Sequence, residues 1–190
     1  MQENQEAPHR IIYSLPHPSF FAQLDGIGGH ISHAVGGVSG WHDNGVDIYA
    51  VVPVGSPQVF SKWCKETIEV PRNGSRLTWN NSILHTVVNT ANIHKVDLVY
   101  IRYVGGFAPW LPRLRRLLGS IPLILEVNSL LTQRTPLAYP IDRQALKAGS
   151  DVITVSDEQR STIKRVGGES VFDRTYVMQN AVDHRRFEDS

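Results

Sequence analysis

The chain has 190 residues, of which 41% are hydrophobic and 19% are charged, and this composition excludes disordered, collagen-like and membrane-embedded proteins. Nineteen basic residues against eighteen acidic ones leave a formal charge of +1, so the chain as a whole has no field that would attract nucleic acid, and we expect no nucleic-acid partner. The length suits a single domain over residues 1–190.

The first part of the chain predicts two buried strands joined by an amphipathic helix. Residues 10–15 form a short apolar run that a proline closes, which is typical of a strand followed by a loop. Apolar residues then recur at helical spacing over residues 27–41. The pair Asn44-Gly45 favours a helix end in the left-handed conformation, and residues 46–53 predict the second strand.

The rest of the chain continues this alternation. We expect a short third strand within residues 60–71, helices at 75–94, 111–118, 142–148 and 156–166, and strands at 97–103, 121–127, 151–155 and 175–178. Strands of continuous apolar character that alternate with helices indicate a parallel sheet covered on both faces. The predicted fold class is therefore α/β, a doubly wound and mostly parallel sheet with helices on both faces.

Gly28 and Gly29 fall in the first strand–loop–helix turn of this predicted fold. In open α/β sheets that turn is the usual place for an anion, because glycine allows a close approach to the backbone and the helix N-terminus carries unpaired amides. A tight turn without a ligand explains the two glycines equally well. A dinucleotide fingerprint fits poorly, because Ile31 stands where the third glycine of G-x-G-x-x-G belongs.

Polar residues near the predicted strand ends are the other candidates. Glu126 and Asn128 follow a central strand, at the edge where α/β proteins bind ligands. The alternative is that Glu126 forms an ion pair with Arg102 at the end of the neighbouring strand, because buried carboxylates are normally paired. His30 and His33 could share a helix face toward a metal ion, but no third ligand lies near them in the sequence, and we expect no metal.

Two helical features have simple explanations at this stage. The arginines within residues 111–118 fit a solvated helix face, and contact with anionic lipid is the alternative. Gly36 and Gly37 lie inside the first predicted helix, where each glycine costs about 1 kcal/mol relative to alanine, and close packing would account for them.

The chain lacks signals for secretion or membrane insertion. No run approaches the ~20 apolar residues of a spanning helix, and the first ten residues lack the apolar centre of a signal peptide. Cys64 is the single cysteine and has no partner for a disulfide within the chain. We therefore expect a cytoplasmic protein with at most peripheral contact at the inner face of a membrane.

Several segments together resemble the N-terminal, acceptor-side domain of family 4 glycosyltransferases, which have the two-domain GT-B fold. The most specific matches are to the family's phrases a-D-x-v-i-x-v-S, at residues 150–156, and P-N-G-V-D-x-x-x-F, which stands here as Gln179 to Asp183 followed by Phe187. The matching segments are residues 28–30, 44–47, 52–53, 96–100, 122–128, 150–156, 179–183 and 187.

The resemblance implies a retaining transfer of a sugar from a nucleotide-sugar to an acceptor hydroxyl. It implies that the amides of Gly28 and Gly29 face the donor diphosphate, that Asn128 and Glu126 take catalytic or orienting positions, and that no metal is needed. Many family members have a histidine where this chain has Asn128, so the usual role of that position is altered here. Residues lining the acceptor groove would be His30, Arg102, Tyr103 and Arg160.

The same resemblance implies that the C-terminal, donor-binding domain is absent from this chain, which would then be inactive alone. Two alternatives remain at the level of sequence. One is a non-catalytic binding subunit that pairs with a separate donor-binding chain. The other is an NAD(P)-binding Rossmann domain, which the irregular glycine spacing disfavours.

Overall fold

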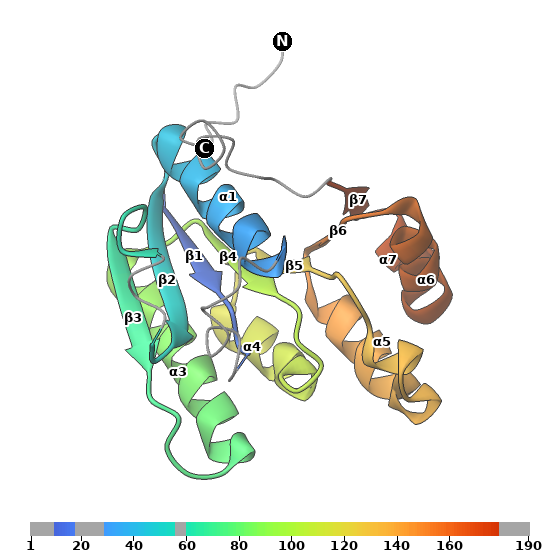
Figure 1. Ribbon diagram of the computed structural model, residues 1–190. Coiled ribbons are helices and arrows are strands. Elements are labelled where there is room, and N and C mark those ends of the chain that lie inside the picture. Colours follow the sequence, from blue (N-terminus) through green and yellow to red (C-terminus); the bar gives the residue numbers. More distant parts are fainter. Residues whose placement is uncertain (1–9, 18–28, 56–59, 179–190) are drawn as a thin grey trace.

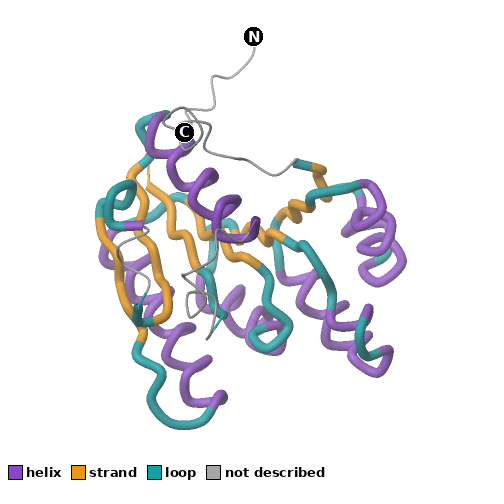
Figure 2. Tube along the Cα trace, viewed as in Figure 1, coloured by secondary structure: helices purple, strands orange, loops and turns teal. Residues whose placement is uncertain are grey.

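The protein, in the computed structural model, is described over residues 10–17, 29–55 and 60–178. Seven strands form one sheet in the order β3-β2-β1-β4-β5-β6-β7, and all neighbouring strands are parallel. Figure 2 shows them as a single row among the helices. Their bounds are β1 Arg10–Ser14, β2 Asp47–Pro53, β3 Glu66–Val70, β4 Leu98–Arg102, β5 Leu123–Glu126, β6 Asp151–Thr154 and β7 Thr175–Val177.

Helices cover both faces of the sheet. The helix α1 lies over one face, and α3, α4, α5 and α6 lie on the other (Figure 1). This arrangement confirms the predicted doubly wound α/β fold. The bounds are α1 Gly29–Asp43, α3 Arg76–His94, α4 Leu111–Leu118, α5 Tyr139–Ala148, α6 Asp157–Gly167 and α7 Glu169–Phe172, with short 3-10 helices η1 Ala108–Trp110, η2 Leu131–Gln133 and η3 Pro136–Ala138.

Two apolar layers explain why the strands read as unbroken hydrophobic runs. In β1, Ile11 and Tyr13 pack with α1, whereas Ile12 belongs to the larger layer formed with α3, α4 and α5. Successive residues of a strand point to opposite faces, so a sheet buried on both sides requires apolar residues at consecutive positions. All three side chains are at most 2% exposed.

Local signals set the helix ends. Ser75 precedes α3, and its side chain accepts a hydrogen bond from the amide of Thr78 at 3.2 Å. Ser156 caps α6 in the same way through the amide of Gln159. Gly45, just after α1, has φ of 78°, the left-handed conformation that glycine adopts most readily.

The structure changes the bounds of some predicted elements, and β4, β5 and β6 are each one to three residues shorter than predicted. The third strand expected within residues 60–71 is confirmed as β3, but α5 begins at Tyr139, three residues before the predicted start. The short helix α7 and the three 3-10 helices have no period long enough to be recognised in the sequence. Within the described part of the chain, no helix is both long and apolar enough to traverse a lipid bilayer.

Candidate functional site

The sheet has its topological switch point between β1 and β4. The chain runs from β1 outward to β2 and β3, and then returns to the other side of β1 to form β4, β5, β6 and β7. The helices that follow β1 and β4 therefore leave in opposite directions, which opens a crevice beyond the carboxyl ends of these strands. The helix α1 begins at this edge with Gly29, while Gly28 lies outside the described residues.

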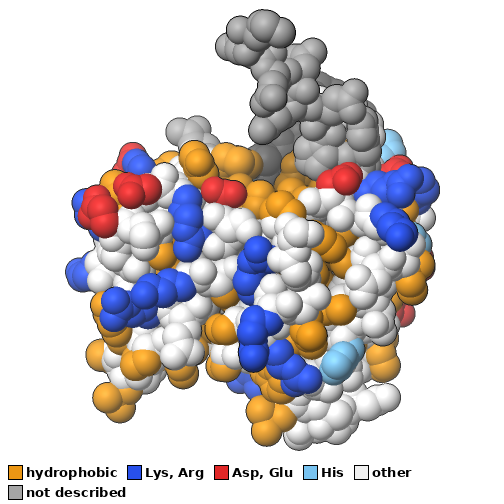
Figure 3. Space-filling view, turned by 180° about the vertical axis from the view of Figure 1, so that it is seen from behind, with side chains coloured by type: hydrophobic (Ala, Val, Ile, Leu, Met, Phe, Trp, Pro, Cys, Tyr) orange, Lys and Arg blue, Asp and Glu red, His pale blue; other side chains and the backbone are white. Residues whose placement is uncertain are grey.

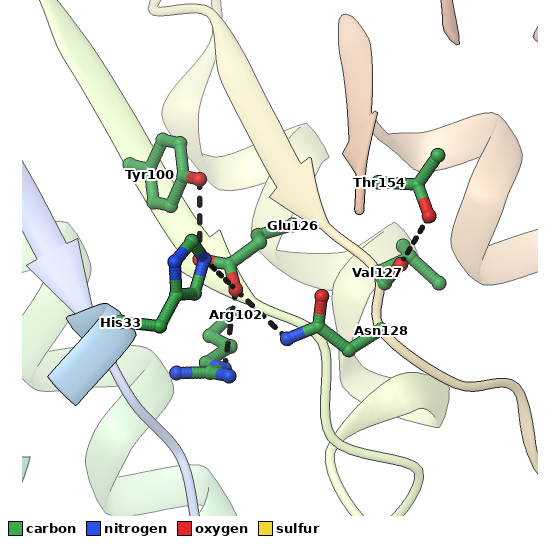
Figure 4. Close-up of polar contacts among 7 residues, drawn as sticks. All are labelled: His33, Tyr100, Arg102, Glu126, Val127, Asn128 and Thr154. Atoms are coloured by element: carbon green, nitrogen blue, oxygen red, sulfur yellow. Dashed lines mark hydrogen bonds and ion pairs between the residues drawn. The ribbon is translucent and has the colours of Figure 1, made fainter. Parts of the chain in front are cut away.

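A buried carboxylate, Glu126, organises the end of β5 at this edge. Its side chain is buried, and Oε1 lies 3.2 Å from Nε of Arg102 and 3.1 Å from Nε2 of His33. Nδ2 of Asn128 donates to the same oxygen at 3.0 Å, and the hydroxyl of Tyr100 donates to Oε2 at 3.1 Å. Figure 4 shows these four side chains converging on the carboxylate from α1, β4 and the segment after β5.

The contacts determine the charge state of this group. Burial by itself raises the pKa of Glu126, but the hydrogen bond from His33 and the charge of Arg102 outweigh it, so the pKa lies below its ordinary value. Burial, followed by the negative charge of Glu126, raises the pKa of Tyr100. Glu126 is therefore an ionised acceptor and Tyr100 a neutral donor.

In this geometry Glu126 is surrounded by donors of the protein itself. Sequence reasoning placed it at a strand tip facing the crevice, whereas its side chain is only 2% exposed and both of its oxygens accept hydrogen bonds. The pairing with Arg102, which was the alternative interpretation, is confirmed. Arg102 is only 8% exposed and its guanidinium contacts the Glu126 carboxylate, so little of this side chain is open to a ligand.

The Asn128 side chain has an acceptor atom that no described residue binds. Its Nδ2 is held by Glu126, but no partner among the described residues reaches its Oδ1, although that atom is buried. In Figure 4 the Oδ1 atom points away from the Glu126 carboxylate. The neighbouring backbone is fixed, because Oγ1 of Thr154 donates to the carbonyl oxygen of Val127 at 2.8 Å. Asn128 is thus an oriented acceptor for a hydroxyl or amide donor.

A second buried carboxylate, Asp142 of α5, supports the loop after β5. It is fully buried and accepts hydrogen bonds from the hydroxyl of Tyr103, from the amide of Thr132 at 2.7 Å and from the hydroxyl of Thr132. Burial is the largest cause that raises the pKa of the Tyr103 hydroxyl, and its hydrogen bond to Asp142 and the negative charge of Asp142 raise it further. One carboxylate therefore ties α5 to the end of β4 and to η2.

A cavity of about 180 Å³ lies among the segments that follow β1, β4 and β5. Gly105 lets these segments approach, because the side chain of Leu131 occupies the space where a Cβ would stand. Ligand pockets commonly have volumes of about 300–1,000 Å³, so this cavity could hold only part of a larger molecule. Its lining residues are His17, Tyr103, Val104, Gly105, Ser129, Leu130, Leu131 and Arg134.

The predicted site residues divide into three groups. Glu126, Asn128 and Arg102 form one cluster, while Tyr103 lines the cavity. Arg160 lies beside Phe172, with its guanidinium carbon 4.2 Å from the centroid of that ring. His30 belongs to α1, but its side chain is outside the described residues, as are residues 179–183 and Phe187.

Among the side chains that the structure describes, no three His, Cys, Asp or Glu residues gather as metal ligands would. His33, the second histidine of the sequence pair, contacts Glu126.

Sequence reasoning missed Asp142, Thr132 and the contribution of residues 129–134 to the cavity. A signal for Asp142 was present, because Ala145 and Leu146 lie three and four positions later on the buried side of α5. A carboxylate on the apolar side of a helix must find donors in the interior. No comparable signal marks residues 129–134, which have no helical or strand period.

Comparison with known proteins finds similarity only at the level of structure. Neither a protein-family model nor a curated protein sequence matches this chain. Solved structures similar to it include a putative UDP-N-acetylglucosamine 2-epimerase from Listeria monocytogenes, with a TM-score of 0.65 and 6% identity over 90% of this chain. The UDP-GlcNAc 2-epimerase from Neisseria meningitidis bound to UDP-GlcNAc has a TM-score of 0.63 and 11% identity over 90%.

MurG from Acinetobacter baumannii is a further similar structure, with a TM-score of 0.52 and 14% identity over 78% of this chain. The chain spans less than half of each of these three proteins, namely 45%, 47% and 41% of their lengths. At these identities the likeness concerns the fold alone. The fold is therefore Rossmann-like and corresponds to one half of a GT-B fold.

Proposed function

We propose that this chain is the acceptor-side domain of a retaining glycosyltransferase that uses a nucleotide-sugar donor. The observation that carries the proposal is the position of the cavity and of the Glu126 cluster, beyond the carboxyl ends of β1, β4 and β5 and beside the start of α1. The similar structures add support, because two of them are named for UDP-N-acetylglucosamine and one of these is bound to UDP-GlcNAc.

In the proposed reaction the nucleoside diphosphate leaves the anomeric carbon of the sugar, the acceptor oxygen bonds to the same face of that carbon, and the proton of the acceptor hydroxyl passes to the departing diphosphate. The positive end of α1, with the amides of Gly28 and Gly29, stabilises the departing diphosphate without a metal. Asn128 orients a sugar hydroxyl through its unpaired Oδ1, and Glu126 fixes Asn128. The acceptor lies along the cavity next to Tyr103, with His30, Arg102 and Arg160 as further predicted contacts.

The donor needs more surface than this chain supplies in the cavity. A volume of about 180 Å³ fits a single sugar unit better than a whole nucleotide-sugar. We propose that a donor-binding domain, in the same polypeptide or in a separate subunit, covers this edge and that the chain is inactive without it. The alternative is that this chain is a non-catalytic binding subunit that pairs with a separate donor-binding chain.

The names of the similar structures favour a second candidate, a domain of a UDP-N-acetylglucosamine 2-epimerase. An epimerase inverts a carbon of the sugar and returns a nucleotide-sugar, whereas a transferase releases nucleoside diphosphate in proportion to the glycosylated acceptor. An NAD(P)-binding domain is the third and least supported alternative, because its glycine fingerprint is incomplete.

A two-stage experiment tests the proposal. An NMR titration of the 190-residue chain with UDP, UDP-GlcNAc and NADH should give shifts for the uridine compounds at α1 and at the end of β5, and none for NADH. Next, the reading frame is followed past Ser190, and the protein with any continuation is incubated with a panel of sugar nucleotides and acceptors. Acceptor-dependent release of nucleoside diphosphate with retained anomeric configuration supports the transferase. Epimerised nucleotide-sugar without release supports the second candidate, and a lack of both binding and turnover contradicts both.

A further inference from the structure

The outward sides of α4 and α5 carry a concentration of positive charge. The exposed or half-exposed charged residues of these two helices are all basic, and their one acid, Asp142, is fully buried. Figure 3 shows Lys and Arg side chains gathered across the middle of this side of the molecule, with acidic side chains mostly toward its upper edge. The basic residues are Arg113, Arg115, Arg116, Arg143 and Lys147.

Two adjacent hollows on this side share Gln144 and Lys147, and together we call them the α4–α5 groove. One hollow has a volume of about 380 Å³ and the other about 340 Å³. Four basic residues line them, whereas the chain as a whole has a formal charge of only +1. The groove is lined by Pro112, Arg115, Arg116, Tyr139, Pro140, Arg143, Gln144, Lys147 and Ala148.

Three of these cations are available to an external anion. Arg115 is committed to the protein, since it donates to the carbonyl oxygens of Gly119 at 2.8 Å and Ile121 at 3.0 Å. Arg116, Arg143 and Lys147 are exposed and form no ion pair within the part of the chain that the structure describes. Like charges that line one groove repel each other unless an anion lies between them.

Exposed apolar side chains accompany the cations. Leu137 of η3, two residues before the start of α5, is 90% exposed, and Leu117, Tyr139 and Ile141 are 46%, 38% and 38% exposed. A nucleic acid offers phosphates but little that would bury such aliphatic side chains, whereas a bilayer interface offers both. The apolar stripe of α4 itself is packed in the core, so the helix cannot roll into lipid and contact must involve the rigid face.

We propose that the α4–α5 groove docks the protein on an anionic phospholipid bilayer. Headgroup phosphates lie between Arg116, Arg143 and Lys147, while Leu137 and its apolar neighbours reach the boundary between headgroups and acyl chains. The inference does not depend on the reaction proposed above, because no residue that lines the α4–α5 groove lines the cavity or belongs to the Glu126 cluster.

Vesicle flotation tests this proposal. We expect the chain to float with vesicles of phosphatidylcholine containing about one third phosphatidylglycerol, to stay behind with pure phosphatidylcholine, and to detach as salt rises. The triple variant Arg116→Glu, Arg143→Glu and Lys147→Glu should bind at least about tenfold more weakly. The control Lys62→Glu, Arg72→Glu and Lys95→Glu changes the net charge equally on other surfaces and should retain binding. Equal loss in both triple variants would reduce the effect to net charge and overturn the proposal.

A second arm separates lipid from other polyanions. Leu137→Ser should weaken vesicle binding by severalfold and leave any retention on heparin unchanged, because only the bilayer buries this side chain. If heparin or duplex DNA binds as tightly as the vesicles and Leu137→Ser has no effect on flotation, the groove recognises polyanions and the lipid assignment is wrong. Circular dichroism and thermal unfolding verify that every variant is folded, which is expected because all the changed residues are exposed.

Discussion

Arg102 and Glu126 occupy paired positions on the neighbouring strands β4 and β5, and Nε of the arginine lies 3.2 Å from Oε1 of the glutamate. Register partners in a sheet point to the same face, so the pair is a direct consequence of the strand register. His33 of α1 contacts the same carboxylate, with its Nε2 3.1 Å from Oε1 of Glu126. The first helix is thereby fixed relative to the strand ends at which a ligand is proposed to bind.

Removing one member of this pair should strongly destabilise the fold. Arg102→Ala leaves the buried Glu126 without its cation and should lower the free energy of unfolding by about 3–5 kcal/mol. Combined with Glu126→Gln, the loss should be smaller than the sum of the two single losses, because no buried charge is left uncompensated. Urea unfolding followed by tryptophan fluorescence measures all three variants. Additive losses would show that the two side chains act independently.

The pH dependence of stability should reflect the same carboxylate. The pKa of Glu126 is lowered in the folded state from an ordinary value of 4.5, so the folded state favours the charged form. This contribution is fully present above about pH 4.5 and is lost as the pH falls through the lower, folded-state pKa. Urea unfolding between pH 7 and pH 3 should therefore show a steeper decline for the natural chain than for Glu126→Gln. Parallel curves would contradict the assignment.

The carboxylate of Asp142 should control the loop that lines the cavity. Tyr103→Phe removes one of its donors and should cost about 1–3 kcal/mol, because the carboxylate stays buried. Tyr139→Phe is the matched control, since that hydroxyl donates to the carbonyl oxygen of Arg165, at 3.3 Å on the surface. Hydrogen exchange should show faster opening around Thr132 in Tyr103→Phe alone. Equal exchange in both variants would exclude a role of Asp142 in holding the loop.

Fold and site were predictable from the sequence to different degrees. The alternation of buried strands and helices yielded the parallel sheet, because burial on both faces forces an apolar residue at nearly every strand position, as in Ile11 to Tyr13. The positions of Glu126 and Asn128 at the carboxyl edge followed from the same reasoning.

Side-chain partners were harder to foresee. The contact of His33 with Glu126 depends on the rotation of α1 about its axis, and the Asp142 cluster depends on how residues 129–134 fold back on α5. Neither has a sequence period. The position of Arg160 beside Phe172 likewise depends on α7, whose four residues are too short for a pattern.

Cys64 should react slowly as long as the protein is folded. Burial raises the pKa of its thiol from 9.0 to about 12. At pH 8 the reactive thiolate is then on the order of a thousandfold scarcer than for a free cysteine. Labelling with a disulfide reagent should be slow in buffer and fast in denaturing urea. Rapid labelling without urea would indicate that the segment around Cys64 opens in the native state.

The glycine at position 37 tests whether α1 needs its interior glycines for close packing. A Cβ built at Gly37 meets no atom of the described residues within 4 Å, so Gly37→Ala should stabilise the fold by about 0.5–1 kcal/mol through its higher helix propensity. Gly167, at the end of α6, is the opposite case, because a Cβ there would lie 2.7 Å from the Cβ of Val171. Gly167→Ala should therefore destabilise the protein, since a branched core side chain must move. Thermal unfolding of both variants makes the comparison, and a loss of stability in Gly37→Ala would mean that another part of the protein packs directly against this face of α1.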